Sequence, residues 1–147
     1  TEIFYSDQKK ISFAYDLINE NRKKNNAKIR YSKNYLIKLM LEFGAHIKIF
    51  TLEIDAKIVA AAICHKTTEN IMYVASWGDH GHDLGYSPMY KFASELVQYC
   101  IEKKYKYLDF GVSSDKQTEN LNLLQFKKNI GCNTTSQTTF VLEFGNL

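Results

Sequence analysis

The segment 85–131 carries the residue types best suited to group-transfer chemistry. Ser87 followed by Pro88 predicts a helix start, because serine caps helices and proline fits the first helical position. The first amides of a helix have no partners within it and carry partial positive charge, so the phosphates of a donor would be stabilised there. Glycines such as Gly85 would let the backbone approach a ligand closely. The alternative is an ordinary capped helix.

An acid and a lysine farther along are the candidate catalytic groups. Asp109 lies in the largely apolar stretch 107–112. A carboxylate in an apolar strand must find partners or take up a proton, so its pKa would be perturbed. It could orient an amine or accept its proton, or it could only anchor neighbouring loop amides. Lys127 follows Phe126 and, if turned inward, could stabilise an oxyanion or a phosphate; as a surface lysine it would have no such role.

The stretch 78–85 is dense in ionisable residues and is expected to be a loop. His80 and His82 could act as a base or a weak metal pair, but no third ligand lies at a suitable spacing, which favours a solvated loop. No spacing elsewhere indicates a metal site. Three tyrosines could donate a proton to a leaving group: Tyr73, Tyr86 and Tyr90. For Tyr73, packing in the core is the alternative.

The helices that must position these residues follow from apolar spacing. Asp7 is expected to cap a first helix, and the polar run 19–28 is expected to end it. Ser32 is expected to cap a second helix, which stops at Gly44. Two further helices are predicted, one from Pro88 to about Ile101 and a short one over 120–129.

The strands are expected over 3–5, 46–54, 58–65, 71–77, 107–112 and 134–144. Short turns join the second, third and fourth into an antiparallel meander, and the long helix after them allows a parallel crossover. The order strand, helix, helix, three strands, helix, strand, helix, strand predicts one α+β domain over 1–147. Its central sheet would be mixed, with helices on both faces.

Composition bounds the class of protein. The chain has 147 residues, enough for one sizeable core but not for two. Its net charge of +3 alone does not indicate nucleic-acid binding. Basic residues nevertheless far outnumber acidic ones between Lys9 and Lys38. They form either the solvated faces of two helices or a patch for a polyanion such as tRNA.

The cysteines and the apolar runs indicate a cytoplasmic protein without membrane insertion. Cys64, Cys100 and Cys132 are odd in number and far apart, as expected of thiols in a reducing compartment. The longest apolar run, 58–64, is far shorter than the ~20 residues that span a bilayer, and no signal peptide is recognisable. The sequence begins at Thr1 instead of methionine, which leaves room for an upstream domain of the same protein.

The order of elements resembles the GNAT acyltransferase fold over nearly the whole chain. Three motifs are similar to the branch that contains FemAB-type peptidyltransferases and related acetyltransferases: Tyr86-Ser87-Pro88, Leu108-Asp109-Phe110-Gly111 and Phe126-Lys127-x-x-x-Gly131. The resemblance implies acetyl-CoA or another acyl-CoA as co-substrate, held where the strand before the main helix splays from its parallel neighbour. By position, Ala75, Ser76 and Trp77 would offer backbone to the pantetheine. Gly85, Tyr86 and Ser87 would face the pyrophosphate.

The resemblance also implies roles for Asp109 and Lys127, which match the Asp-Phe-Gly and Phe-Lys positions of the branch. There the lysine is associated with substrate binding or with stabilising the transfer intermediate. This sequence departs from the common pattern in one respect. The pyrophosphate signature, Arg or Gln before a Gly-x-Gly or Gly-x-Ala loop, is absent before Ser87, and Asp79 and Asp83 would repel phosphate.

Three functions are therefore open. The first is an acyl-CoA-dependent N-acyltransferase acting on a primary amine of a small molecule, an amino sugar or a cell-envelope precursor. The second is a FemAB-type domain that takes aminoacyl-tRNA as donor. The third is a non-catalytic half-domain that contributes to an acceptor groove.

Overall fold

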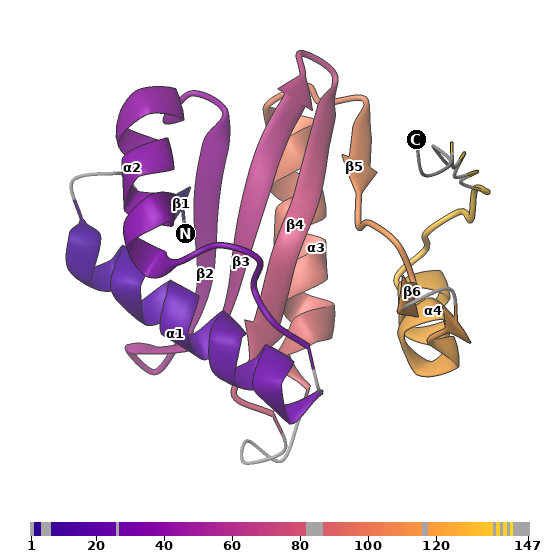
Figure 1. The fold of residues 1–147 in the computed structure, drawn as a ribbon, viewed down its shortest axis with the longest axis horizontal. Coiled ribbons are helices and arrows are strands. Elements are labelled where there is room, and N and C mark those ends of the chain that lie inside the picture. Colours follow the sequence, from indigo (N-terminus) through magenta and orange to yellow (C-terminus); the bar gives the residue numbers. More distant parts are fainter. Residues whose placement is uncertain are drawn as a thin grey trace, which may run out of the picture. The chain divides into compact units, whose positions relative to one another are not determined.

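The computed structural model describes residues 2–3, 7–25, 27–81, 87–115, 118–136, 138, 140 and 142. The chain divides into two compact units, Thr1–Val112 and Ser113–Leu147. Among the described residues, the first unit contains the main sheet and three helices, and the second contains a short hairpin and one helix (Figure 1). Whether 1–147 works as one domain stays a prediction. None of the helices in the described part is both long enough and apolar enough to cross a bilayer.

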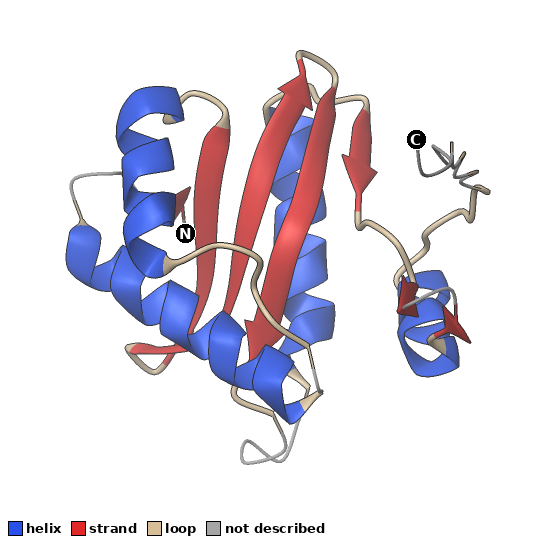
Figure 2. Ribbon diagram, in the orientation of Figure 1, coloured by secondary structure: helices blue, strands red, loops and turns tan. Residues whose placement is uncertain are grey.

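The first unit is built on a five-stranded sheet in the order β1-β2-β3-β4-β5 (Figure 2). Its strands are β1 (Glu2–Ile3), β2 (Ile47–Ile54), β3 (Lys57–Thr68), β4 (Ile71–Asp79) and β5 (Tyr107–Asp109). All neighbours are antiparallel except β4 and β5, which are parallel. The predicted meander and the predicted parallel crossover are both confirmed.

Helices cover both faces of this sheet, as predicted. α1 (Gln8–Lys24) and α2 (Lys33–Phe43) share one core cluster with Ala61 and Ile63 of β3. α3 (Pro88–Glu102) shares a second cluster with Ala60 and Ala62. Neighbouring residues of β3 thus face opposite cores, because side chains alternate along a strand. The middle of β3, residues 59–64, is buried, which explains the run of small apolar residues in the sequence.

The predicted N-caps of α1 and α2 are confirmed. Asp7 Oδ1 accepts a hydrogen bond from the amide of Lys10 at 3.1 Å, and Ser32 Oγ accepts one from Tyr35 at 3.2 Å. α1 ends at Lys24, inside the polar run 19–28 that was predicted to end it, and Asn25 is its C-cap. Glu, Arg and Lys are good helix formers, so the helix continues some way into this run before it stops.

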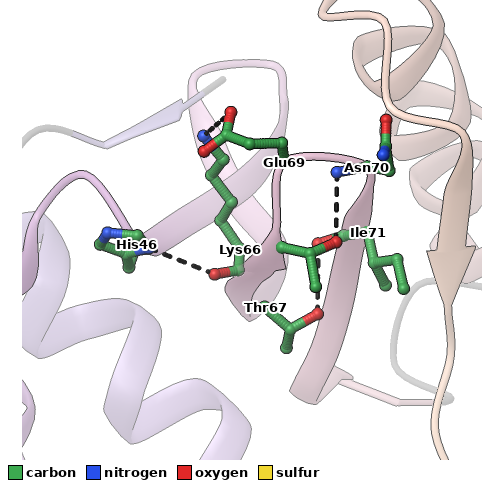
Figure 3. A network of polar contacts seen from close by, with 7 residues as sticks. His46, Lys66, Thr67, Glu69, Asn70 and Ile71 are labelled. Carbon is green, nitrogen blue, oxygen red and sulfur yellow. Dashed lines mark hydrogen bonds and ion pairs between the residues drawn. The ribbon is translucent and has the colours of Figure 1, made fainter.

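Two hairpins connect the middle strands. Asp55 and Ala56 have φ of 50° and 60°, the left-handed values of a two-residue hairpin turn. At the other hairpin, Lys66 forms an ion pair with Glu69 at 2.7 Å, and its carbonyl contacts His46 Nδ1 at 3.4 Å (Figure 3). The hydrogen bond between the two side chains raises the pKa of Lys66 and lowers the pKa of Glu69. These contacts stabilise the turn from which β4 begins.

The second unit holds β6 (Ser114–Asp115), β7 (Thr118–Glu119) and α4 (Leu121–Asn129), and Asn120 caps α4. The predicted strand over 134–144 is wrong at its described positions, which belong to no strand. Phe140 is 92% exposed, so the alternating pattern finds no apolar cover. Such a segment becomes a strand only when a neighbour takes up its hydrogen bonds and side chains. The hairpin β6–β7 was not predicted.

Candidate functional site

The parallel pairing between β4 and β5 is short. It comprises three residue pairs and ends with Tyr73 opposite Asp109. β4 continues to Asp79 and stays paired with β3 over that length. The predicted strand 107–112 ends early because Gly111 turns the backbone to φ +71°, which is incompatible with an extended strand. The ladder between the two strands therefore ends at Tyr73.

A β-bulge lies in β4 just beyond this point. Val74 and Ser76 lie opposite consecutive residues of β3, so Ala75 has no partner there. A bulge reverses the alternation of the side chains that follow it. Val74 belongs to the core on the α3 side, and Trp77, three residues on, packs against the same core. The buried Ser76 and Gly78 then lie on the opposite face, toward α1.

An aromatic pair joins the second half of β4 to the residue that follows β5, on the α3 side. The ring centroids of Trp77 and Phe110 are 4.9 Å apart, with an interplanar angle of 40°. Both rings are partly buried against the core under α3. Phe110 directly follows β5, so this contact closes one face of the sheet where the ladder has ended.

The end of β4 is fixed to α1 by a close contact. A Cβ on Gly78 would lie 2.8 Å from Cβ and Cγ of Asn21, so only glycine fits without a shift. Asn21 Nδ2 donates to the Asp79 carbonyl at 2.9 Å and to its Oδ1 at 3.1 Å, and the Gly81 amide donates to the same Oδ1 at 3.0 Å. The carboxylate of Asp79, expected in a loop, is thus bound at the end of the strand.

The start of α3 agrees with the predicted helix start. Ser87 is the N-cap and Pro88 the first helical residue, but the Ser87 side chain makes no capping hydrogen bond. The first turn contains no acidic residue. Gly85 and Tyr86, which were predicted to share a pyrophosphate site with Ser87, lie outside the described residues, as does His82.

Asp109 and Lys127 belong to different units. The expectation that the Asp109 carboxylate is enclosed by apolar residues is wrong: the residue is exposed at the end of a short strand. Its Oδ1 accepts a hydrogen bond from the Gly111 amide at 2.7 Å, the loop-anchoring contact considered as an alternative. Lys128 is exposed, as predicted, whereas Lys127 is 5% exposed, which excludes the alternative of a surface lysine at that position. The catalytic roles of Asp109 and Lys127 stay predictions.

Three buried polar atoms on the α1 side of the sheet were not anticipated. Arg22 Nε, Tyr31 Oη and His65 Nε2 are buried without a hydrogen-bond partner among the described residues. Burial raises the pKa of Tyr31 to about 12, although the charge of Arg22 opposes this, and burial lowers the pKa of His65. The His65 ring meets Tyr73 edge-on, with centroids 6.2 Å apart.

The sequence offered one signal for this group, a single histidine at the end of an apolar strand. Tyr31 gave no local signal, because its burial depends on the segment between α1 and α2. That segment is held to α1, since Tyr15 Oη donates to the Tyr31 carbonyl at 2.7 Å. Ile29 and Tyr31 also pack against the core that α1, α2 and the sheet share.

Comparisons with known proteins agree on the fold. A family model described as an acetyltransferase (GNAT) domain matches residues 4–128. An aminoglycoside acetyltransferase from an uncultured soil metagenomic sample, solved with sisomicin, is 16% identical at a TM-score of 0.68, covering 99% of this chain and 95% of that one. A predicted acetyltransferase from Clostridium acetobutylicum, solved with acetyl-CoA, is 12% identical at a TM-score of 0.68, covering 97% and 94%.

A ribosomal-protein-alanine N-acetyltransferase from Brucella melitensis biovar Abortus 2308 is also similar, at 12% identity and a TM-score of 0.64, covering 98% of each chain. At these identities the structures establish the fold alone. No curated protein matches the sequence.

Proposed function

Since the chain belongs to the GNAT acetyltransferase family, we propose that it is an N-acyltransferase that moves an acyl group, most simply acetyl, from acyl-CoA to a primary amine. The observation that carries this proposal is the early end of the β4–β5 ladder. β4 runs on to Asp79, whereas the parallel pairing stops at Tyr73. The backbone around Ala75, Ser76 and Trp77 can then hydrogen-bond a slender ligand in place of a strand.

Acyl-CoA would supply an activated thioester, which the amine attacks directly: the C–N bond forms and the C–S bond breaks, releasing the thiol. The chain would contribute position and polarity. Backbone amides near Ser76 and Trp77 would polarise the thioester carbonyl. The first turn of α3, without an acidic residue and without a side-chain cap from Ser87, would attract the pyrophosphate. Gly85 and Tyr86 complete the proposed donor site.

Asp109 and Lys127 remain the proposed catalytic residues. Asp109 places a carboxyl group beside the end of the β4–β5 pairing, and one of its oxygens accepts a hydrogen bond from the Gly111 amide. Lys127 is buried, and a buried ammonium is retained only where it meets negative charge or hydrogen-bond acceptors. Asp109→Asn preserves the bond to Gly111 but removes the charge. If the charge orients the amine, kcat should fall about 10-fold or more with acetyl-CoA affinity unchanged.

The proposed acceptor is a small molecule, an amino sugar or a cell-envelope precursor with a primary amine. Two of the similar structures are named as enzymes that acetylate amines, an aminoglycoside and a ribosomal protein alanine. A panel of sisomicin, glucosamine and an alanine-initiated peptide therefore covers the chemistry that the family suggests.

Trp77 is the single tryptophan of the chain, which makes its fluorescence a specific probe of donor binding. A thioester arm that enters beside β4 must slide along or displace the Trp77–Phe110 pair. Titration with acetyl-CoA should therefore change the emission saturably and raise the unfolding temperature. Adenosine 3′,5′-bisphosphate, which has the nucleotide end but no pantetheine arm, should change the emission much less. No spectral change and no thermal stabilisation at millimolar acetyl-CoA would refute the proposal.

Aminoacyl-tRNA is a second candidate donor, favoured by exposed basic residues at the end of α1 and just after it: Lys23, Lys24, Lys28 and Arg30. It predicts tRNA binding with a steep salt dependence. Lys23→Glu combined with Lys24→Glu should weaken that binding at least 10-fold, and unchanged affinity would exclude this donor. If the chain binds acetyl-CoA but acetylates no amine, that result would support the third function, a non-catalytic role in an acceptor groove.

A further inference from the structure

One row of residues crosses the sheet at the point where β4 and β5 part. His65 of β3 lies opposite Tyr73 of β4, and Tyr73 lies opposite Asp109 of β5. Residues that are register partners in neighbouring strands project to the same face of a sheet. His65 and Tyr73 alternate with Cys64 and Val74, which belong to the core on the α3 side, so the row faces α1.

Two further polar groups lie on the same face. Tyr31 packs against the core that α1, α2 and the sheet share, and the Tyr15 hydroxyl of α1 donates to its carbonyl at 2.7 Å. Within the described part of the chain, Arg22 Nε, Tyr31 Oη and His65 Nε2 have no hydrogen-bond partner although each atom is buried. A buried polar atom without a partner is costly, so three of them on one face offer hydrogen-bonding groups that a bound ligand would complete.

The chemistry of these groups selects the ligand. Arg22 Nε–H can only donate a hydrogen bond, and the Tyr31 hydroxyl, which stays protonated, also donates one readily. Together they suit a ligand oxygen that accepts hydrogen bonds, such as that of a hydroxyl group. A neutral imidazole offers a lone pair, and the nearby Asp109 carboxylate attracts a cation. An amine whose neighbouring carbons carry hydroxyls, as in an amino sugar, has both features.

We propose that this row and the two groups beside it form the acceptor site, in which His65 takes the proton of the bound ammonium while Tyr31 and Arg22 bind a neighbouring hydroxyl. The inference rests on the proposed acyl-CoA-dependent function and names its acceptor class and its base. The ammonium gives one proton to His65 Nε2, and the amine then attacks the thioester carbon. The second proton leaves with the thiolate as CoA thiol, and His65 returns its proton to solvent.

The titratable and charged groups on the face that His65 occupies are Arg22 and Tyr15 of α1, Tyr31 between the helices, Tyr73 of β4 and Asp109 of β5. Of these, the Tyr73 ring meets His65 edge-on. Burial keeps His65 neutral to a lower pH than an exposed histidine. The base is therefore available at neutral pH and is lost on acidification.

The test compares His65→Gln with His46→Gln, whose histidine is exposed directly before β2 and serves as the matched control. Glucosamine is the acceptor probe, and CoA release is measured with acetyl-CoA from about pH 5 to pH 8. His65→Gln should lower kcat about 100-fold at neutral pH. Its activity relative to wild type should rise as the pH falls, because the wild-type base becomes protonated. Trp77 fluorescence should report unchanged acetyl-CoA affinity, and His46→Gln should behave as wild type.

Tyr31→Phe tests the hydroxyl-binding part, with cyclohexylamine as an amine that has a similar ring without hydroxyls. The variant should raise KM for glucosamine about 10-fold and leave cyclohexylamine unaffected. Its unfolding temperature should stay constant or rise, because an unsatisfied buried hydroxyl is removed. A purely structural tyrosine would change neither KM nor the ratio of the two amines.

The outcomes separate this inference from the proposed function. If wild type binds acetyl-CoA and acetylates amines while His65→Gln keeps the wild-type kcat and pH profile, the acceptor site is overturned and the transferase function stands. Unchanged selectivity in Tyr31→Phe would overturn the hydroxyl contact in the same way. If wild type neither binds acetyl-CoA nor releases CoA with any amine, the transferase function itself fails.

Discussion

Replacing Gly78 by alanine would test how closely α1 must approach β4. The added Cβ would lie 2.8 Å from Cβ and Cγ of Asn21 and 3.0 Å from its Oδ1. Rotation of the Asn21 side chain can move the amide but not its Cβ, which the helix backbone fixes. The alanine therefore has to push α1 away from the strand, at the same place where Asn21 binds Asp79.

The expected loss of stability follows from these two effects. Overpacking in a closed contact costs about 1–3 kcal/mol. The two hydrogen bonds from Asn21 contribute roughly 0.5–1.5 kcal/mol each, and at least one is lost when the amide moves. Gly78→Ala should thus lower the free energy of unfolding by about 2–4 kcal/mol, a large part of the stability of a typical domain.

Urea unfolding at equilibrium measures this change, and the identity of the clashing atom can be checked in two backgrounds. Asn21→Gly removes the Cβ that the alanine meets, whereas Asn21→Ala keeps it. The cost of Gly78→Ala should fall below about 1 kcal/mol in the first background and stay above it in the second. Equal costs in both backgrounds would show that the contact with Asn21 is not what requires glycine.

Three more predictions concern single positions. Because burial lowers the pKa of His65, the unfolded state binds more protons than the native state below about pH 6.5, so the free energy of unfolding should fall on acidification until the native histidine is also protonated. In urea titrations at several pH values, His65→Gln should remove this part of the pH dependence, and an unchanged pH dependence would refute the prediction. In Gly111→Ala the new residue would have a φ of +71° and a Cβ 3.2 Å from Tyr73 Cε2. Thermal unfolding should therefore show a loss of about 1–2 kcal/mol or more in the free energy of unfolding. A variant as stable as wild type would contradict the strained turn. The Cys64 thiol is buried, and burial raises its pKa, so alkylation of the native protein should modify the half-buried Cys132 first. Early loss of the unmodified Cys64 peptide in mass spectra would contradict this packing.

Local signals in the sequence were sufficient for most of the first unit. Asp7 and Ser32 predicted two helix starts correctly, because a cap depends on a side chain and an amide three residues away. The run of small apolar residues over 58–65 predicted a strand, and in the structure side chains from its two faces belong to two different cores. These features need no knowledge of distant partners.

The features that depend on a partner were missed. The bulge at Ala75 exists only in relation to β3, and nothing in β4 itself marks it. The segment 134–144 has the alternation of a strand, yet its described positions form none, since alternation does not supply a neighbour. Asp109 was expected in a longer strand, but the turn at Gly111 ends β5 and leaves the carboxylate exposed.

The bulge also decides how the two proposed substrates would meet. Before it, Tyr73 shares the α1 face with His65; after it, Trp77 lies on the α3 side with Phe110. Without the extra residue, Trp77 would turn toward α1 and the aromatic pair could not form. A donor that enters along Trp77 and an acceptor bound near His65 would therefore approach the same stretch of β4 from opposite faces. Direct attack requires that both substrates are bound at the same time, and sites on opposite faces allow this, because neither substrate has to leave before the other binds.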